Sequence, residues 1–294
     1  MTIPYHDLLI ARGKQFLRYA YVCRLHRPAD LVLFLLPGLW ATLLATHGSP
    51  DWGRLISLLL AATLIRCAAW VFNDWMDSRL LPEAPESWLS QGKISLREEL
   101  WLLGSLLGAA LLLLLLLPVK VFYFAWPAPL LLAAYPFIKT RLLLTQPFLG
   151  LCYAWLVPMA YAAQDLAPGK ATWLLFTATL LWASAFTTLH ALPRNSLDRQ
   201  LGIRSLSQLF EDNSWLFIMA MQLSAVFTLW LAGSQMELGL FFSLGLIVTA
   251  FLLPYQLWLL FSHPVEGPMR SYHNQIWSGI AILCGVGFHY LCVC

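Results

Sequence analysis

Long apolar stretches separated by short polar segments run along almost the whole of this chain. A membrane-spanning helix needs about 20 mostly apolar residues, and stretches of that length recur nine times. The pattern predicts an all-α membrane protein with nine transmembrane helices, built as a single domain over residues 1–294. The predicted spans are 29–47, 54–74, 97–117, 119–138, 147–164, 171–192, 214–233, 236–261 and 275–293.

The composition supports a polytopic protein in a lipid bilayer. Hydrophobic residues make up 60% of the 294 residues and charged residues only 11%, whereas soluble domains carry about 25% charged residues. The 14 tryptophans and 10 tyrosines are typical of aromatic belts at the two membrane surfaces. A net charge of +3 gives no reason to expect nucleic acid as a partner.

Basic residues divide unevenly between the two sides of the predicted bundle. With nine alternating spans, the side that holds the N-terminus carries fourteen of them, and the other side carries Arg54, Lys120 and Lys170. The positive-inside rule therefore predicts a cytoplasmic N-terminus and a C-terminus outside. Residues 1–28 mix basic and apolar side chains, which indicates an amphipathic segment lying on the membrane surface.

Two long polar loops fall on the predicted cytoplasmic side. They follow the second and sixth spans and have about 22 and 21 residues, and loops of that length are more often functional than spacers. The first opens with Asn73, Asp74 and Asp77, and the second opens at His190. We expect a polar cap on the cytoplasmic face, with a functional site beneath it.

The end of the second span holds the densest set of polar residues, Arg66-Cys-Ala-Ala-Trp-Val-Phe-Asn-Asp-Trp-Met-Asp77. Charged side chains at membrane depth usually face a bundle interior and mark a site. On a helix, Asn73 and Asp77 are four residues apart and Asp74 and Asp77 three, so the three can share one side. Their oxygens suit Mg²⁺ bound together with phosphate. The alternative is a helix C-terminus with an Asn-Asp turn at the surface.

Five parts of the chain carry recognisable motifs: Arg24–Pro28 with Leu36–Trp40; Arg66–Asp77; Tyr135–Lys139 with Gln146–Gly150 and Trp155–Ala160; Gly202–Ser205; and Tyr272–Gln275. Together they make the chain resemble the UbiA superfamily of membrane prenyltransferases, and within it the 4-hydroxybenzoate polyprenyltransferases of ubiquinone synthesis. The resemblance covers nearly the whole chain. It implies nine helices around a central cavity that is open to lipid, in a bacterial-type inner membrane.

The resemblance also implies a reaction. A polyprenyl chain would move from its diphosphate to an aromatic acid such as 4-hydroxybenzoate, with Mg²⁺ as cofactor, and other quinone-pathway proteins are candidate partners. The implied catalytic residues are Asp74, Asp77 and Lys139. The implied magnesium ligands are Asn73, Asp74, Asp77 and Asp198. The implied substrate-binding residues are Arg24, Arg66, Asn73, His190, Arg194 and Asp198.

Departures from the family pattern cluster in its two aspartate-rich motifs. The last aspartate expected in the first motif is Leu81 here, and the stretch that follows is acidic instead of basic. In the second motif Thr187 and Arg194 stand where aspartates are expected and His190 where a tyrosine is expected, so that only Asp198 remains. The family's diphosphate site has therefore lost about half of its carboxylates.

Three functions remain open on the sequence. One is an active transferase in which His190 and Arg194, four residues apart on one helix face, supply positive charge in place of a second Mg²⁺. Another is an inactive relative that binds isoprenoids or scaffolds a quinone-synthesis assembly. The third is a small-molecule transporter, which only the nine spans favour. His190 and Arg194 could also anchor a helix end at the lipid headgroups. The remaining acidic residues near the first long loop are expected to be solvated: Glu83, Glu86, Glu98 and Glu99.

Overall fold

The computed structural model describes residues 17–81, 88–89, 91–210, 213–263 and 265–293, and within these ranges it contains helices and no strand. A helical turn covers residues 17–22. The labelled helices are α2 (Pro28–Ala45), α3 (Trp52–Leu80), α4 (Leu96–Leu114), α5 (Lys120–Ala125), α6 (Pro127–Arg141), α7 (Thr145–Ala154), α8 (Leu156–Ala163), α9 (Lys170–Ala191), η1 (Leu192–Arg194), α10 (Asn195–Gln200), α11 (Leu206–Phe210), α12 (Ser214–Gln235), α13 (Leu240–Ser262) and α14 (Gly267–Val293).

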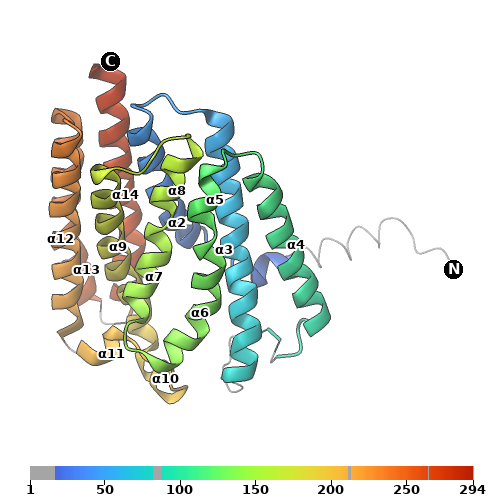
Figure 1. Cartoon of the computed structure of the whole chain (residues 1–294). Helices are drawn as coiled ribbons and strands as arrows, with labels where there is room; N and C mark the ends of the chain where they lie inside the picture. The colour runs from blue at the N-terminus through green and yellow to red at the C-terminus, as the bar shows by residue number, and fades with distance from the viewer. Residues whose placement is uncertain (1–16, 82–87, 90, 211–212, 264, 294) are drawn as a thin grey trace, which may run out of the picture.

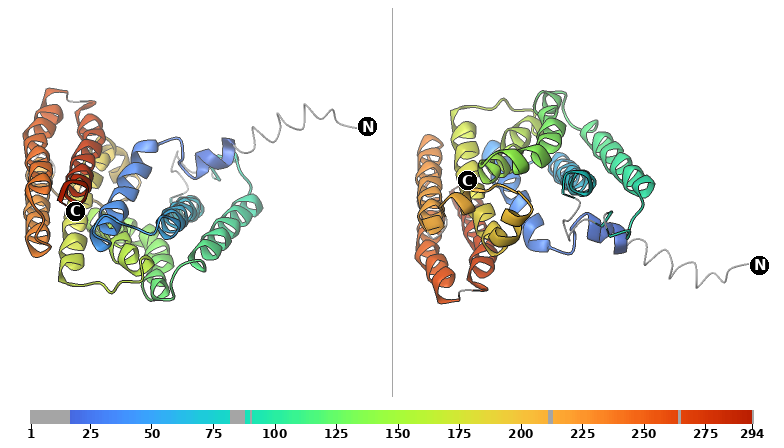
Figure 2. Two further views of the ribbon diagram at one scale, coloured as in Figure 1. Left: turned by 90° about the horizontal axis from the view of Figure 1, so that it is seen from above. Right: turned by 90° about the horizontal axis from the view of Figure 1, so that it is seen from below.

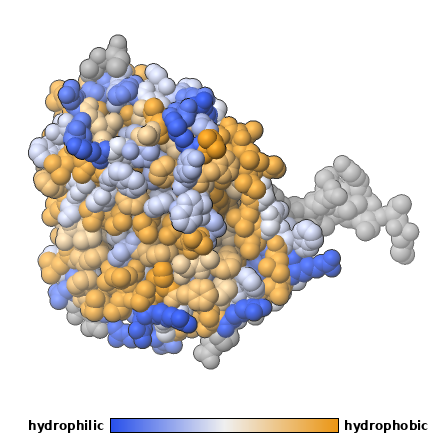
Figure 3. All heavy atoms as spheres, in the orientation of Figure 1, coloured by the Kyte–Doolittle hydropathy of each residue, from blue (hydrophilic) through white to orange (hydrophobic). Residues whose placement is uncertain are grey.

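The longer helices stand side by side in one bundle (Figures 1 and 2). The helices α12, α13 and α14 form one edge and α3 and α4 the other, and α2, α8 and α9 lie between them. The main core is built where these central helices meet, around Trp40 and Phe186, which are almost fully buried. On the face shown in Figure 3, other apolar side chains form an outward-facing belt. Polar residues lie at both ends of this belt.

Small residues set the closest helix contacts, as is typical of membrane bundles. Gly150 of α7 lies directly against the backbone of α9, where an added Cβ would come within 2.5 Å of the Leu180 carbonyl oxygen. Gly245 of α13 approaches Ala281 of α14 in the same way, at 2.6 Å. The contact at Gly150 brings α7 close enough to α9 for the two helices to share a cavity.

The number of spans differs from the nine predicted. Among the described residues, six helices are long and apolar enough to cross a membrane. A seventh is added if Lys120–Leu131 and Ala133–Arg141, which are bent by 43° relative to each other, count as one span. The predicted span 147–164 is broken at Trp155 into α7 and α8, each too short to cross alone. The predicted span 97–117 contains α4, whose first turn carries three charged side chains. Nine spans remain a proposal.

Both predicted long loops lie at the same end of the bundle (Figure 1). There α3 ends and α9 passes into η1, α10 and α11, while the C-terminus lies at the opposite end. Helix α3 continues to Leu80, beyond the predicted end at residue 74. Asn73 and Asp77 are therefore helical, and the surface-turn alternative is wrong. Most of the predicted amphipathic N-terminal segment lies outside the described residues.

Glycine 150 provides a test of this packing. Gly150→Ala should lower stability by about 1–3 kcal/mol, because overpacking against a backbone carbonyl forces α7 away from α9. Gly108→Ala is the matched control: it is exposed on α4 and an added Cβ meets no described atom within 4 Å. Thermal unfolding of both variants in detergent should show a lower midpoint for Gly150→Ala only. Equal midpoints would contradict the close α7–α9 contact.

Candidate active site

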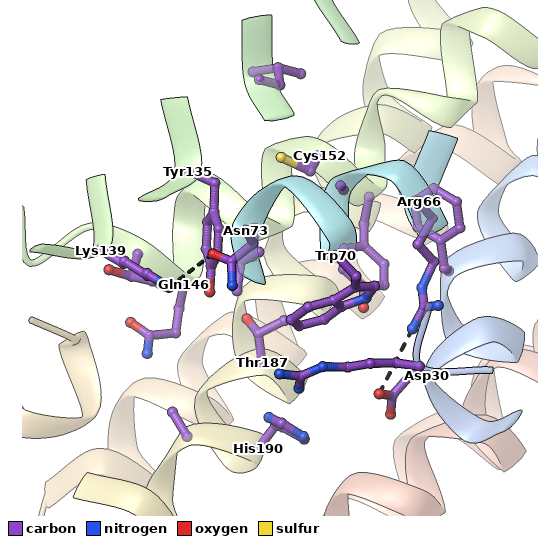
Figure 4. Close-up of a pocket in the computed structure, with 18 of the residues that line it drawn as sticks. Asp30, Arg66, Trp70, Asn73, Tyr135, Lys139, Gln146, Cys152, Thr187 and His190 are labelled. Carbon is purple, nitrogen blue, oxygen red and sulfur yellow. Dashed lines mark hydrogen bonds and ion pairs between the residues drawn. The ribbon is translucent and has the colours of Figure 1, made fainter. Parts of the chain in front are cut away.

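A cavity of about 280 Å³ opens inside the bundle between α3, α6, α7 and α9 (Figure 4). Its walls are mostly apolar and aromatic, with the polar groups gathered toward the end where α3 and α9 terminate. The structure brings every residue predicted for the site to this one cavity: Arg24, Arg66, Asn73, Asp74, Asp77, Lys139, His190, Arg194 and Asp198. Their individual roles remain proposals.

Lys139 joins α6 to α3 across one wall. Its ammonium group donates a hydrogen bond to Asn73 Oδ1 at 2.9 Å and forms an ion pair with Asp77 Oδ1. Asn73 Nδ2 in turn donates to Asp77 Oδ2 at 2.8 Å. The Lys139 side chain is only 6% exposed and that of Asp77 17%, so each charge depends on the other. Lys139 also sits in the last turn of α6, where the helix dipole favours a cation.

A second ion pair lies about two turns further from the C-terminal end of α3 and links three helices. Arg66 Nη2 of α3 is 3.8 Å from Asp30 Oδ2 of α2, and the Tyr272 hydroxyl of α14 donates to Asp30 Oδ1 at 2.7 Å. Arg66 Nη1 is buried and makes no hydrogen bond within the described part of the chain. The sequence prediction missed Asp30, although a carboxylate near the start of an apolar span was a usable signal.

Two further cations, Arg24 and Arg194, line the cavity from residues just beyond helix ends. The Arg24 guanidinium lies 3.9 Å from the centre of the Trp70 ring, a favourable cation–π arrangement. Arg194 lies in η1, because α9 ends at Ala191 just before Pro193. Both His190 and Arg194 line the cavity, and their shared helix face stays a prediction. His190 remains on α9, with its ring 5.1 Å from that of Tyr272.

Asp74 takes a different direction from its two neighbours in the motif. Its carboxylate accepts hydrogen bonds from the backbone N–H of Trp88, at 3.0 and 3.1 Å, and of Leu89 at 3.2 Å. It thus fixes the segment that leads from α3 into α4, whereas Asn73 and Asp77 pair with Lys139. Glu99, predicted to be solvated, is instead only 1% exposed. Glu98 is partly exposed and accepts hydrogen bonds from Ser95 in the capping box of α4.

The side chains that could act as metal ligands decide what kind of metal site the cavity can form. Within the described ranges, no three His, Cys, Asp or Glu side chains are grouped so as to hold a metal by themselves. Mg²⁺, however, is usually bound by one or two carboxylates together with substrate phosphates. Asp77, Asn73 and Asp198 fit that requirement. They suit a magnesium ion that is bound with a diphosphate, but they do not form a complete protein cage.

The polar end of this apolar bundle holds cations, carboxylates and aromatic rings. Such a site suits a ligand with an anionic head and an apolar body, bound by a membrane protein. The comparison with known proteins is consistent with this class. The model of the UbiA prenyltransferase family matches residues 34–279. This chain belongs to the UbiA prenyltransferase family.

Similar proteins of known name support the assignment over nearly the full length. A 4-hydroxybenzoate octaprenyltransferase of Hahella chejuensis is 32% identical over 93% of this chain and 92% of its own length. The protein of the same name from Nitrosococcus oceani is 34% identical, over 93% and 97%. A UbiA homologue from Aeropyrum pernix has the same fold, with a TM-score of 0.72 and 22% identity over 87% and 97% of the two chains. A homologue from Archaeoglobus fulgidus, solved with DMAPP and Mg²⁺, gives 0.67 and 15% over 94% and 100%.

The Lys139–Asp77 ion pair can be tested without any assumption about substrate. Lys139→Met should cost about 3 kcal/mol of stability, because it leaves the half-buried carboxylate of Asp77 without its cation. The double variant Lys139→Met/Asp77→Asn should regain most of that loss. Unfolding of the single and double variants in detergent measures the coupling. Strictly additive effects would show that the two side chains do not form a pair.

Proposed function

We propose that this protein transfers a polyprenyl chain from its diphosphate to 4-hydroxybenzoate in ubiquinone-type quinone synthesis. The observation that carries the proposal is one cavity that holds an ion-paired polar head region beside apolar and aromatic walls. A substrate with a charged diphosphate and a long hydrocarbon chain needs both environments. Membership of a prenyltransferase family and the names of the similar proteins favour this activity over an inactive scaffold or a transporter.

The diphosphate would bind at the polar end of the cavity, whose lining includes Lys139, Arg194 and Arg24. Asn73, Asp77 and Asp198 would hold Mg²⁺ there, and the bound metal would supply positive charge for the departing diphosphate. Lysine and arginine stabilise the same developing charge, arginine through a bidentate contact. Asp74 contributes by fixing the segment at Trp88 and Leu89 instead of binding the metal.

The aromatic acid would bind beside the second ion pair, between Arg66 and Asp30. Arg66 offers a buried N–H that has no partner in the described structure and is held in place by Asp30. A carboxylate is the group that best satisfies such a donor. Asp30 is in turn held by the Tyr272 hydroxyl, so the guanidinium is oriented before the ligand arrives. The two subsites would then lie on either side of Trp70, which stands between Asn73 and Arg66 along α3 (Figure 4).

The reaction then needs no covalent bond to the protein. The bond between the first prenyl carbon and the diphosphate oxygen breaks, and the diphosphate leaves with the electron pair. A ring carbon of the acceptor forms the new carbon–carbon bond, and the displaced ring proton passes to the diphosphate or to water. Aromatic side chains in the wall favour the cation-like prenyl carbon. The apolar tail would lie between helices and extend into the lipid, with the polar end of the bundle on the cytoplasmic side.

The decisive test is turnover by the purified protein in detergent with geranyl diphosphate, 4-hydroxybenzoate and Mg²⁺, read by product mass. A prenylated product that is lost with EDTA is expected. Asp77→Ala should reduce turnover at least ~100-fold, because it removes a carboxylate from the diphosphate end. Asp165→Asn is the control: Asp165 pairs with Lys120 before α9 begins, at the other end of the bundle. No product beside an active family member would favour the inactive alternative.

Arg194 gives a more specific prediction. Arg194→Asp should weaken binding of a non-reacting thiodiphosphate analogue ~10-fold at low Mg²⁺, because a bidentate phosphate contact is lost, and raised Mg²⁺ should recover much of the affinity. Calorimetric titration at several Mg²⁺ concentrations measures the effect. Arg66→Met is the matched control, since it should raise the KM for 4-hydroxybenzoate instead. Equal affinity of Arg194→Asp and the unchanged protein at every Mg²⁺ concentration would refute the role of Arg194.

A further inference from the structure

Gln146, in the first turn of α7, is a cavity-lining glutamine that is only 2% exposed and lies beside Lys139 (Figure 4). Its Oε1 atom accepts a hydrogen bond of 2.8 Å from the backbone N–H of Leu206. Its Nε2 atom makes no hydrogen bond to any residue that the structure describes. A buried N–H group without a partner is unfavourable, so this group is available to a ligand in the cavity.

The bond from Leu206 also fixes the orientation of the Gln146 amide. A backbone N–H can only donate, so the atom that meets it must be the carbonyl oxygen of the glutamine and not its NH₂ group. Rotating the amide by 180° would set two donors against each other and would lose the bond at 2.8 Å. Gln146 therefore offers the cavity a hydrogen-bond donor.

The segment 203–206, which contains the Leu206 donor, belongs to the polar end of the cavity. The Arg204 backbone N–H donates to the Lys139 carbonyl at 2.7 Å, and the Ile203 N–H donates to the Asp198 carbonyl at 2.8 Å. These bonds tie the segment to two residues that line the cavity at the proposed diphosphate site. The free amide N–H is thus held close to that site.

We propose that Gln146 is a substrate-binding residue whose Nε2 group donates a hydrogen bond to an oxygen of the prenyl diphosphate while its Oε1 atom holds the segment 203–206. This inference rests on the proposed function for the identity of the ligand. An anionic oxygen is a strong acceptor for a buried amide donor, and the first turn of α7 favours a negative charge through the helix dipole. The carboxylate of the aromatic acid has its own proposed donor in Arg66.

The first test is Gln146→Met, which removes both hydrogen bonds and keeps a side chain of similar length. Binding of a non-reacting thiodiphosphate analogue, measured by calorimetric titration, should become ~10-fold weaker, the loss expected for one hydrogen bond to a charged group. The affinity for 4-hydroxybenzoate should change less than ~3-fold. Amide hydrogen exchange of peptides that cover 203–208 should be ~10-fold faster, because the Leu206 N–H loses its acceptor.

Thr145→Val is the matched control for a loosened segment. The Thr145 hydroxyl donates to the Arg204 carbonyl at 2.7 Å, so valine removes that bond and leaves the Gln146 amide in place. Exchange in 203–208 should again be faster, whereas affinity for the analogue should fall less than ~3-fold. Gln146→Glu makes the opposite change. Its carboxylate still accepts from Leu206, so exchange should stay within ~2-fold, while affinity should fall at least ~10-fold because an acceptor replaces the donor.

Three results would overturn the proposal. If Thr145→Val weakens binding of the analogue as much as Gln146→Met, Gln146 acts only through the segment 203–206. If Gln146→Met lowers the affinity for 4-hydroxybenzoate and not for the analogue, the amide serves the aromatic acid. Unchanged affinity for the analogue in Gln146→Glu would show that no donor faces the diphosphate. Binding does not depend on turnover, so the expected affinities without any prenylated product would count against the proposed function and leave the role of Gln146 standing.

Discussion

The arrangement of this site depends on the cost of placing charge inside an apolar bundle. The Lys139 side chain reaches from α6 to α3, where its ammonium group contacts Asn73 and Asp77 and its charge is neutralised. An isolated ammonium or carboxylate at this depth would be strongly unfavourable, so each helix that brings a charge inward must meet a helix that brings the opposite one. Arg66 and Asp30 repeat the solution between α3 and α2. The two pairs hold α3 between its neighbours and so define the walls of the cavity.

The same requirement governs how a ligand can enter. Lys139 can turn to a phosphate oxygen only if Asp77 gains another positive partner, because either group alone would be left buried and unpaired. A diphosphate that binds together with Mg²⁺ satisfies both groups at once, whereas the diphosphate alone would satisfy only Lys139. The resting ion pair thus supports the proposed use of a metal, as does the chemistry of the leaving group. Arg66 differs, since one of its N–H groups is already available.

The site residues could be predicted from the sequence because each stands in a short segment with its own polar pattern and family motif. Each predicted span overlaps helix, and each predicted site residue reaches the cavity. Contacts between segments that are far apart in the chain could not be predicted from the sequence. Adjacent helical residues point about 100° apart around the axis, so the sequence leaves open whether the Asp74 side chain points with Asn73 and Asp77. In the structure it points to the backbone of Trp88 instead. Asp30 is held by a hydrogen bond from the Tyr272 hydroxyl, which lies 242 residues later in the chain. Glu99 looks solvated in sequence and is buried because α4 packs along α3.

The missing carboxylates of the second motif need not signal a lost site. Replacing an expected aspartate by Arg194 changes the local charge by two positive units, which equals the charge of one Mg²⁺. A site that loses a metal ligand and gains an arginine at the same position can keep its attraction for a diphosphate while depending on fewer ions. Arginine also brings directed hydrogen bonds that a hydrated ion does not. On this argument Arg194 can present to a leaving group the positive potential that a second metal ion would otherwise supply, in the same cavity that the Lys139–Asp77 pair lines.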